Sequence, residues 1–329
     1  MIPLPLNIED PWGIDQPYHP TVVYTQEGLF GHRYWMAQTP YPIVDRLPYR
    51  DRYEVPCVYY SDDGIKWTPI NNPIDDLTEI EIEKKCYFSD PHLVKKNDTL
   101  ELYYRLMCED EINILYKRIS TNGLEWSERI VVIDLHEANS REKYGNDIIS
   151  PAITWSASNG YRCWYVDDVH TNKDRHVRLI QSIDGLLWTT SVICNLDNDE
   201  IIPWHIDVQY IDGRYEMLVF DVDNQSIDWF KSIDGYHFKY FYHVIHPSRR
   251  KWDFYEVGLY RACLVKYNDD YLIYFSAHNQ KDSCIGLIIF RNGNILIISG
   301  QSSIKTLCWN IYVYYKKLRK WAKQMICRK

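Results

Sequence analysis

Polar side chains that suit acid–base chemistry or anion binding stand at the start of five short apolar runs. These side chains are His19, Asp90, Ser150, His205 with Asp207, and Tyr260 with Arg261. A histidine can give or take a proton near pH 7, and an aspartate can orient it or act as the base itself. An arginine offers a planar fork of donors that suits phosphate and carboxylate groups. Where the five runs converge in space, their first residues form one site.

Each candidate residue has a role that follows from its chemistry. The acid–base candidates are Asp90, His205, Asp207 and His19, and the candidates for substrate binding are Arg261, Tyr260, Arg105, Ser150, Glu256 and His92. We expect no cofactor and no bound metal, because His205 and Asp207 are a lone pair of possible ligands. The alternative for each of these residues is a structural role, in which its hydrogen bonds satisfy a strand end.

A repeated turn motif shows how the five runs are organised. The chain contains "SIDGLLW" from Ser182 and repeats the pattern as "SDDGIKW" from Ser61, "STNGLEW" from Ser120 and "SIDGYHF" from Ser232. Asp-Gly and Asn-Gly are strong hairpin signals, because these residues tolerate the positive φ of tight turns. A repeat about every 50 to 60 residues is typical of propeller blades and solenoid units.

The same order of predicted strands accompanies each turn. An apolar run with a polar start comes first, a second strand follows a short polar turn, a third leads into the motif and a short fourth completes the unit. Five such units begin near residues 15, 87, 148, 203 and 258. The pattern predicts an all-β fold, a five-bladed β-propeller over residues 1–300, with unrelated β-meanders or a sandwich as the alternative. In a propeller the starts of all inner strands meet at one end of the central channel.

Several stretches resemble a known group of propellers. "SDPHLV" (Ser89–Val94) followed by "LYYR" (Leu102–Arg105) resembles the glycoside hydrolase 43/62/32/68 superfamily. "HPTVVY" and "YEVPCVYYSDDGIKW" resemble bacterial surface-polysaccharide-associated relatives of that superfamily. The resemblance implies an axial pocket in which inner strands supply three carboxylates for glycosidic bond chemistry. Asp90 matches one of them, whereas His19 and Ser150 occupy the other two positions, so the standard hydrolase mechanism is not expected.

Composition restricts the class of protein and its compartment. The chain has 329 residues, of which 46% are hydrophobic and 28 are tyrosines, and this indicates a globular protein with a large core. Its nine cysteines are scattered without a C-x-x-C pair, which favours a reducing compartment and argues against a disulfide scaffold or zinc site. The start lacks a signal-peptide pattern, and no apolar run reaches about 18 residues, so we expect a cytoplasmic protein.

Residues 301–329 differ from the rest of the chain in charge and periodicity. They hold eight Lys and Arg and no Asp or Glu, which leaves 29 basic and 45 acidic residues, a net charge of −16, in residues 1–300. From Ser302 apolar residues recur every three or four positions, which predicts a basic amphipathic α-helix. Residues 302–329 then either lie on an anionic membrane surface or pack on the propeller. The acidic body argues against nucleic acid as a partner.

These features together favour an enzyme that acts on carbohydrate. We expect a glycosyltransferase in bacterial surface-polysaccharide biosynthesis, because the hydrolase carboxylates are incomplete and the axial arginines suit an activated donor. Its partners are then a sugar or activated-sugar donor and a glycan acceptor, and the basic helix places it peripherally on the inner membrane face. The alternatives are a glycoside hydrolase or phosphorylase with altered acid and base residues, and a glycan-binding propeller without activity.

Overall fold

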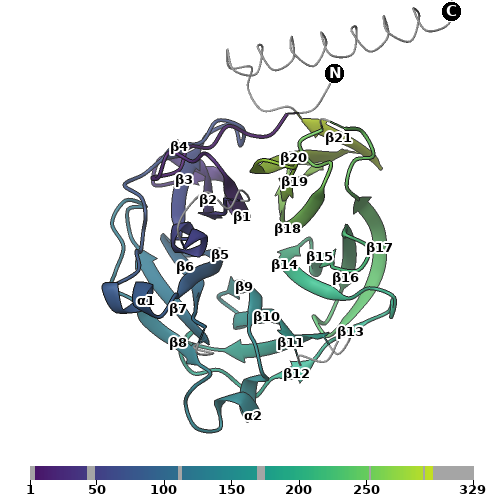
Figure 1. Ribbon diagram of the computed structural model, residues 1–329. Coiled ribbons are helices and arrows are strands. Elements are labelled where there is room, and N and C mark those ends of the chain that lie inside the picture. Colours follow the sequence, from purple (N-terminus) through teal and green to yellow (C-terminus); the bar gives the residue numbers. More distant parts are fainter. Residues whose placement is uncertain are drawn as a thin grey trace, which may run out of the picture.

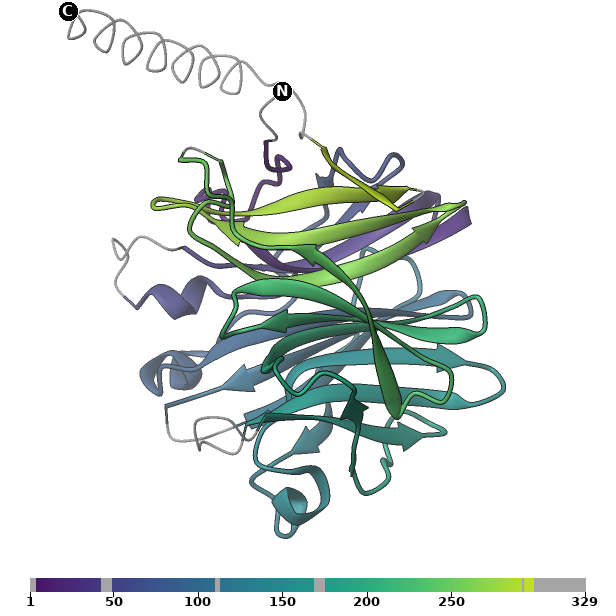
Figure 2. The same cartoon turned by 90° about the vertical axis from the view of Figure 1, so that its right-hand side faces the viewer.

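A computed structural model shows five sheets of antiparallel hairpins arranged in a ring around a central axis (Figure 1). It describes residues 4–42, 49–109, 113–168, 175–251, 253–291 and 293–298. Each sheet is one blade, and the first strand of each blade lies nearest the axis. Figure 2 shows the ring from the side, with blades 1 and 5 at the top and blade 3 at the bottom. The predicted five-bladed propeller is confirmed.

The first three blades follow one another along the chain. Blade 1 contains β1 (Pro17–Leu29), β2 (His32–Pro40), β3 (Cys57–Ser61) and β4 (Thr68–Pro69). Blade 2 contains β5 (Tyr87–Lys96), β6 (Thr99–Met107), β7 (Asn113–Ser120) and β8 (Ile130–Asp134). Blade 3 contains β9 (Ile149–Ser156), β10 (Gly160–Asp168), β11 (Arg175–Ser182) and β12 (Val192–Ile193).

The last two blades complete the ring. Blade 4 contains β14 (Pro203–Ile211), β15 (Arg214–Asp221), β16 (Ser226–Ser232) and β17 (His237–Ile245). Blade 5 contains β18 (Gly258–Tyr267), β19 (Asp270–His278), β20 (Ser283–Arg291) and β21 (Asn294–Ile298). The five inner strands start within two residues of the predicted positions. Blade 4 departs from four strands, because the two residues of β13 (Asn195–Leu196) pair in parallel with its outer strand.

The repeated motif forms the same turn in each of four blades. In blade 3, the Gly185 N–H donates to Ser182 Oγ at 2.8 Å, while Asp184 Oδ1 accepts from two following backbone N–H groups. The turn also docks each blade on its neighbour. A Cβ at Gly123 of blade 2, where φ is +77°, would lie 2.2 Å from the Trp35 ring of blade 1, so only glycine allows this contact. The motif therefore recurs because each blade must pack on the previous one.

The ring closes between blades 5 and 1 through backbone and side-chain contacts. The Leu6 N–H donates to the Ile285 carbonyl at 2.8 Å, and the Tyr274 hydroxyl donates to the Gly64 carbonyl at 2.9 Å. One apolar core cluster combines buried residues of blades 1, 2 and 5. Burial of this shared core holds the first and last blades together, and no strand of the described residues is exchanged between them.

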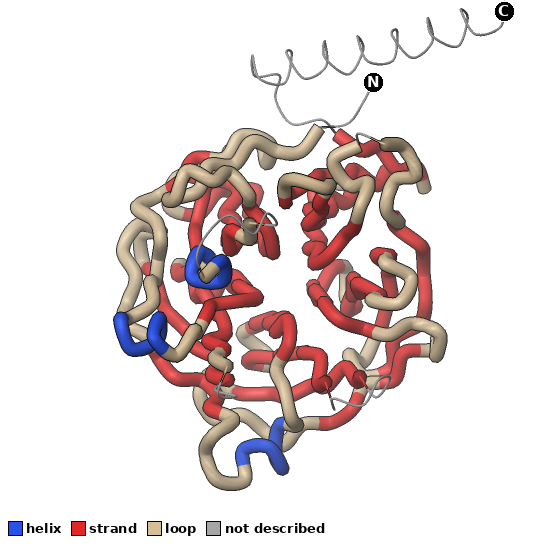
Figure 3. Tube along the Cα trace, in the orientation of Figure 1, coloured by secondary structure: helices blue, strands red, loops and turns tan. Residues whose placement is uncertain are grey.

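The helical segments of the described residues are short. α1 (Glu79–Glu83) and α2 (Ser140–Tyr144) lie at the outer edge of the ring (Figure 3), and a single 3₁₀ turn, η1, spans Arg50–Tyr53. No helix in the described ranges is long and apolar enough to span a membrane. The predicted helix over 302–329, and with it the division into domains 1–300 and 301–329, lies outside the described residues.

One pair of cysteines departs from the expectation of reduced thiols. Cys86, just before β5, and Cys108, just after β6, form a disulfide, while Cys57, Cys163 and three further described cysteines are buried and free. The two bonded residues are 22 positions apart in sequence. Sequence spacing does not reveal such a pair, because hairpin pairing of β5 with β6 brings their ends together.

Candidate functional site

A β-bulge interrupts every inner strand at the same height, near its start. The pairing with the second strand loses register there in all five blades. Three of the bulged residues, His19, Asp90 and Ser150, have left-handed φ angles of 51°, 51° and 53°. A bulge changes the direction of a side chain that would otherwise face a neighbouring blade. Left-handed φ values in residues other than glycine are strained, and such strain concentrates at functional sites.

Two hydrogen bonds join neighbouring inner strands at the same level of the channel. The Leu93 N–H donates to Thr21 Oγ1 at 3.3 Å, and the Leu264 N–H donates to Asp207 Oδ2 at 2.9 Å. These bonds relate blade 2 to blade 1 and blade 5 to blade 4. The pairing with the second strands gives the register of all five blades, in which the equivalent positions lie five residues before Tyr24, Lys95, Trp155, Tyr210 and Lys266. The five equivalent residues are His19, Asp90, Ser150, His205 and Arg261.

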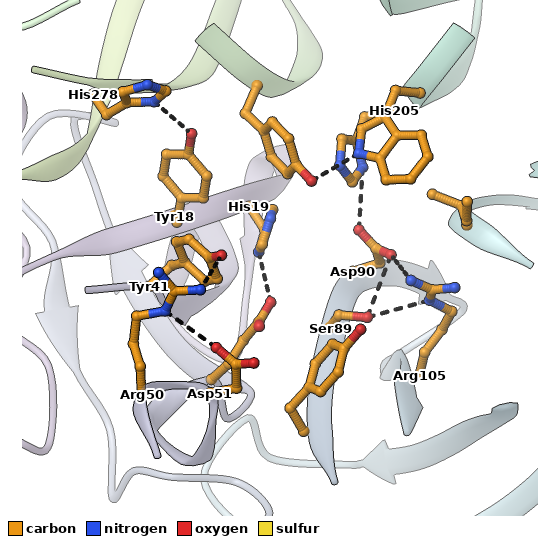
Figure 4. Close-up of a pocket in the computed structure, with 15 residues that line it drawn as sticks. Tyr18, His19, Tyr41, Arg50, Asp51, Ser89, Asp90, Arg105, His205 and His278 are labelled. Atoms are coloured by element: carbon orange, nitrogen blue, oxygen red, sulfur yellow. Dashed lines mark hydrogen bonds and ion pairs between the residues drawn. The ribbon is translucent and has the colours of Figure 1, made fainter. Parts of the chain in front are cut away.

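The bulges open onto a pocket of about 380 Å³ at one mouth of the channel (Figure 4). Aromatic side chains form much of its wall, and charged groups form its base. The pocket is lined by Tyr18, His19, Tyr41, Arg50, Asp51, Glu54, Tyr87, Ser89, Asp90, Arg105, Ile149, Trp204, His205, Tyr260 and His278. A concave site with a few convergent polar groups is the usual form of a small-molecule site.

His19, Asp90 and His205 come together at the base of the pocket. One ligand-type atom from each residue lies within 4.8 Å of the others, and all three residues are buried. His205 Nδ1 lies 3.2 Å from Asp90 Oδ1, yet neither atom has a hydrogen-bond partner with acceptable geometry, and His205 Nε2 has none either. Two imidazoles and a carboxylate that converge in a buried place, with ligand-type atoms left without a hydrogen-bond partner, suit a cation site.

The neighbours of this trio orient its ligand atoms. His19 Nδ1 lies 2.7 Å from Thr39 Oγ1 and 3.2 Å from Glu54 Oε1, so its Nε2 is the nitrogen left for a ligand. Asp90 Oδ2 receives Arg105 Nη2 at 2.9 Å, which leaves Oδ1 open. Metal-binding histidines commonly donate their other ring N–H to a carboxylate in this way.

Burial and charge set the protonation states at the base of the pocket. Burial lowers the pKa of His19 and of His205, so both imidazoles are neutral at neutral pH. Burial alone would raise the pKa of Asp90, but the positive charges of Arg105 and Arg261 outweigh it and hold that pKa well below the usual range. Burial and the charge of Asp90 raise the pKa of Glu54 well above its ordinary value. Neutral imidazoles and an ionised carboxylate are the forms that bind a metal ion.

Two imidazoles and one carboxylate fit a divalent cation such as Zn²⁺ or Mn²⁺. The expectation of no metal considered only His205 with Asp207. The structure separates that pair, because Asp207 lies two residues further along β14, roughly 7 Å deeper in the channel. It instead combines His205 with two residues from blades 1 and 2, which are far away in sequence.

The other predicted site residues divide between the pocket and the channel beneath it. Arg105 and Tyr260 line the pocket. Asp207, His92 and Arg261 are fully buried under its base and do not line it. Asp207 and His92 stand two residues further along their strands than His205 and Asp90, and the Arg261 side chain reaches across the axis below the pocket. The predicted roles of these three residues in catalysis and substrate binding therefore stay predictions.

Two further candidates have no place in the pocket wall. The Ser150 hydroxyl donates to the Ile206 carbonyl at 2.9 Å and accepts the Ile206 N–H at 3.1 Å, so it joins blades 3 and 4. Glu256 lies in the segment before β18 and is not among the lining residues. Both were expected to bind substrate, and the structure places both elsewhere.

Several lining residues were not predicted. Glu54 lies in the loop between η1 and β3, outside any inner strand, so a search of strand starts does not find it. Tyr18 and Trp204 directly precede His19 and His205, and the pairs "YH" and "WH" are the signal that could have identified them. The Trp204 indole N–H donates to the Tyr260 hydroxyl at 2.7 Å, which fixes both rings at the wall.

Comparison with known proteins gives a consistent picture of the fold. No family model matches the chain. A curated relative, an A type blood N-acetyl-alpha-D-galactosamine deacetylase of Flavonifractor plautii, is 24% identical over 246 residues, which cover 62% of this chain and 31% of the relative. The match thus spans less than a third of that protein. An F. plautii N-acetylgalactosamine deacetylase, solved in complex with blood group B trisaccharide, superposes with a TM-score of 0.71, 20% identity and 91% coverage of both chains.

Solved glycoside hydrolases share the architecture at lower similarity. A thermostable family-43 glycoside hydrolase gives a TM-score of 0.61 with 14% identity, covering 88% of this chain and 95% of its own. A family-43 β-xylosidase/α-arabinofuranosidase from a compost metagenome, solved with xylotriose, gives a TM-score of 0.62 with 12% identity. The match covers 88% of this chain and 96% of the other. The expectation of a glycosyltransferase is wrong on these findings, because the similar proteins are a deacetylase and glycoside hydrolases. The chain has the five-bladed propeller fold of family-43 glycoside hydrolases, and the proteins it is similar to process carbohydrate.

Proposed function

We propose that the protein is a metal-dependent carbohydrate deacetylase that acts on an N-acetylated sugar in the axial pocket. The observation that carries the proposal is the convergence of His19, Asp90 and His205 where a family-43 hydrolase would need carboxylates. Hydrolysis of an amide gains more from a metal centre than cleavage of a glycosidic bond does. The similarity to the F. plautii deacetylase supports the same class of reaction.

The aromatic wall suits the apolar face of a sugar ring. Tyr18 stacks between Tyr41 and Tyr260, with ring centroids 5.7 and 5.4 Å away and interplanar angles of 19° and 22°. Trp204 stands beside Tyr260. Aromatic walls bind sugars by contact with their C–H groups, while polar groups at the base fix orientation. In the proposed complex, a substituent of the sugar ring, rather than the whole ring, reaches the residues at the base.

In deacetylation, water adds to the amide carbonyl carbon, the C–N bond breaks, and acetate and a free amine leave. A bound divalent ion would polarise the carbonyl and lower the pKa of a water molecule. His19, Asp90 and His205 would hold the ion, and Arg105 keeps Asp90 ionised and oriented. Glu54 lines the pocket with a raised pKa, which suits a group that takes a proton from the attacking water and gives it to the leaving nitrogen.

One observation favours a second candidate, a glycoside hydrolase with altered residues. Glu54 and Asp90 line one pocket, and their surroundings push their pKa values in opposite directions. Such a pair can serve as the acid and the base of glycosidic bond cleavage. In that case Glu54 is the acid, and the two histidines bind substrate.

Product analysis separates the two candidates. Glycans that end in N-acetylgalactosamine or N-acetylglucosamine are incubated with the protein after EDTA treatment, with and without added Zn²⁺ or Mn²⁺. The deacetylase proposal predicts metal-dependent release of acetate and a glycan that gains one amine. Release of a free sugar that is insensitive to EDTA supports the hydrolase, and acetate release that is insensitive to EDTA contradicts the metal centre.

A further inference from the structure

Arg261 is the fifth member of the axial ring, and it is the only cation among the five equivalent residues. Its side chain is fully buried beneath the pocket. From blade 5 it reaches across the axis to blades 2 and 3, where Nη2 lies 3.4 Å from His92 Nδ1 and 3.4 Å from the Pro151 carbonyl. The fold therefore fixes a positive charge in the centre of the channel.

This guanidinium lies next to the open ligand atom of the cation site. Arg261 Nη1 is 3.8 Å from Asp90 Oδ1, the same oxygen that faces His205. Nη1 and Nε of Arg261 have no hydrogen-bond partner among the described residues. A charged group with open donors is costly to bury unless its charge is compensated, and the compensating charges here are the buried Asp207 and Asp90, the carboxylate that would also bind the metal.

We infer that Arg261 is a positioning residue that shares Asp90 with the bound cation and sets the affinity of the site for it. This inference rests on the proposed metal centre. In the metal-free protein, Arg105 orients the Asp90 carboxylate and Arg261 adds a second positive charge beside it. When a divalent cation binds, the ion, Arg105 and Arg261 all face one buried carboxylate, so the charge of Arg261 makes binding weaker than it would be without that charge.

A reason for this arrangement follows from the chemistry of the ion. A cation that receives less negative charge from its surroundings is the stronger Lewis acid toward an amide carbonyl. Lys at position 261 would keep the charge, whereas the shorter side chains of Met and Gln would remove it. The inference thus concerns the charge of Arg261 and not the volume of its side chain.

The experiment measures the Kd of Zn²⁺ by competition with a chromophoric chelator at pH 7.5. It compares the wild type with Arg261→Met, Arg261→Gln and Arg261→Lys. Arg129→Met serves as the control, because Arg129 is a half-buried arginine paired with Asp75 and Glu81, away from the axis. We expect both neutral variants to bind Zn²⁺ at least tenfold more tightly than the wild type. Arg261→Lys should stay within about threefold of the wild type, and Arg129→Met should leave the Kd unchanged.

The possible results have distinct meanings. A neutral variant that folds, as judged by circular dichroism, and binds Zn²⁺ no more tightly than the wild type overturns the role of Arg261. Equal tightening in Arg261→Lys also overturns it, because the charge is then irrelevant. If neither the wild type nor the neutral variants bind Zn²⁺, the proposed metal centre itself fails. The Gln variant keeps a polar group that can form hydrogen bonds in the channel, so the test stands even where Arg261→Met does not fold.

Discussion

His205 Nδ1 lies 3.2 Å from Asp90 Oδ1, although blades 4 and 2, which carry these residues, are not neighbours in the ring. Blade 3 separates them, and its equivalent residue Ser150 is too short to fill the space at the axis. His19 approaches the same point from blade 1. The site thus uses the symmetry of the propeller, because three inner strands, each with a bulge near its start, bring different ligands to one place.

The first prediction concerns the carboxylate of this site. Asp90→Asn should lower the affinity for Zn²⁺ at least a hundredfold and reduce deacetylation by a similar factor, since the amide has no charge for the cation. Isothermal titration with Zn²⁺ and an acetate assay measure the two effects. Asp184→Asn, which makes the same substitution in a surface turn, should change neither. Full activity in Asp90→Asn would exclude Asp90 as a ligand.

The second prediction distinguishes the role of Glu54 in proton transfer from the role of the three metal ligands. Glu54→Gln should retain one bound Zn²⁺, because its amide oxygen can still accept from His19 Nδ1. Its kcat should fall at least a hundredfold, since the variant cannot exchange a proton with the attacking water. His19→Ala is the comparison and should lose both metal and activity. A Glu54→Gln variant with a wild-type kcat would show that Glu54 only orients His19.

The third prediction concerns the aromatic wall. Trp204→Ala should raise KM for the N-acetylated sugar at least tenfold and leave kcat within about threefold, because the wall binds the ring in ground and transition states alike. Trp204→Phe keeps the aromatic face but loses the hydrogen bond to Tyr260, and its KM should rise less. Steady-state kinetics on a soluble oligosaccharide measures both. A large loss of kcat in Trp204→Phe would show that this hydrogen bond has a catalytic role.

The fourth prediction concerns acid stability and the repeated turn. Backbone N–H groups of Leu187 and Leu186 lower the pKa of Asp184 to about 2, whereas an unfolded aspartate titrates near about 3.9. The folded-state pKa is depressed, so Asp184 contributes stability above about pH 4. That contribution is lost as the pH falls through 2.

The matched variants follow from the copy of the turn in blade 2. Asn122 Oδ1 accepts the same two backbone bonds there, at 2.9 and 2.8 Å, without a charge. Asp184→Asn should therefore keep the turn and flatten the fall in the free energy of unfolding between about pH 4 and 2. Asn122→Asp should make the free energy of unfolding fall more steeply over the same pH range. Denaturant unfolding at several pH values provides the measurement. If the free energy of unfolding depends on pH in the same way in both variants as in the wild type, the ionised Asp184 does not contribute to stability.

The sequence was sufficient for the fold because the propeller repeats its local signals. The motif at Ser182 and its copies marked the turns, and alternating strands between them marked the blades. The polar starts led to His19, Asp90 and His205, which do meet at the axis. Each of these residues could be found because it holds the same position in its own blade.

Other parts of the site could not be predicted, because they depend on loop contacts and strand register that the repeated motif does not specify. Glu54 comes from a connecting loop, and its contact with His19 exists only in three dimensions. The depth of Asp207 and Arg261 depends on where each bulge falls along its strand. Likewise, the disulfide between Cys86 and Cys108 requires the register of one hairpin. Arg261 was predicted to bind substrate at the axis, and the sequence could not show that its side chain lies below the pocket.

The central claim is that His19, Asp90 and His205 hold a cation at the propeller axis. Anomalous X-ray diffraction on crystals soaked with Zn²⁺, measured on both sides of the zinc absorption edge, tests it most directly. We predict one strong anomalous peak at bonding distance, about 2.0 to 2.2 Å, from a nitrogen of each histidine and from an oxygen of Asp90. An ordered pocket without an anomalous peak between these three side chains would contradict the account.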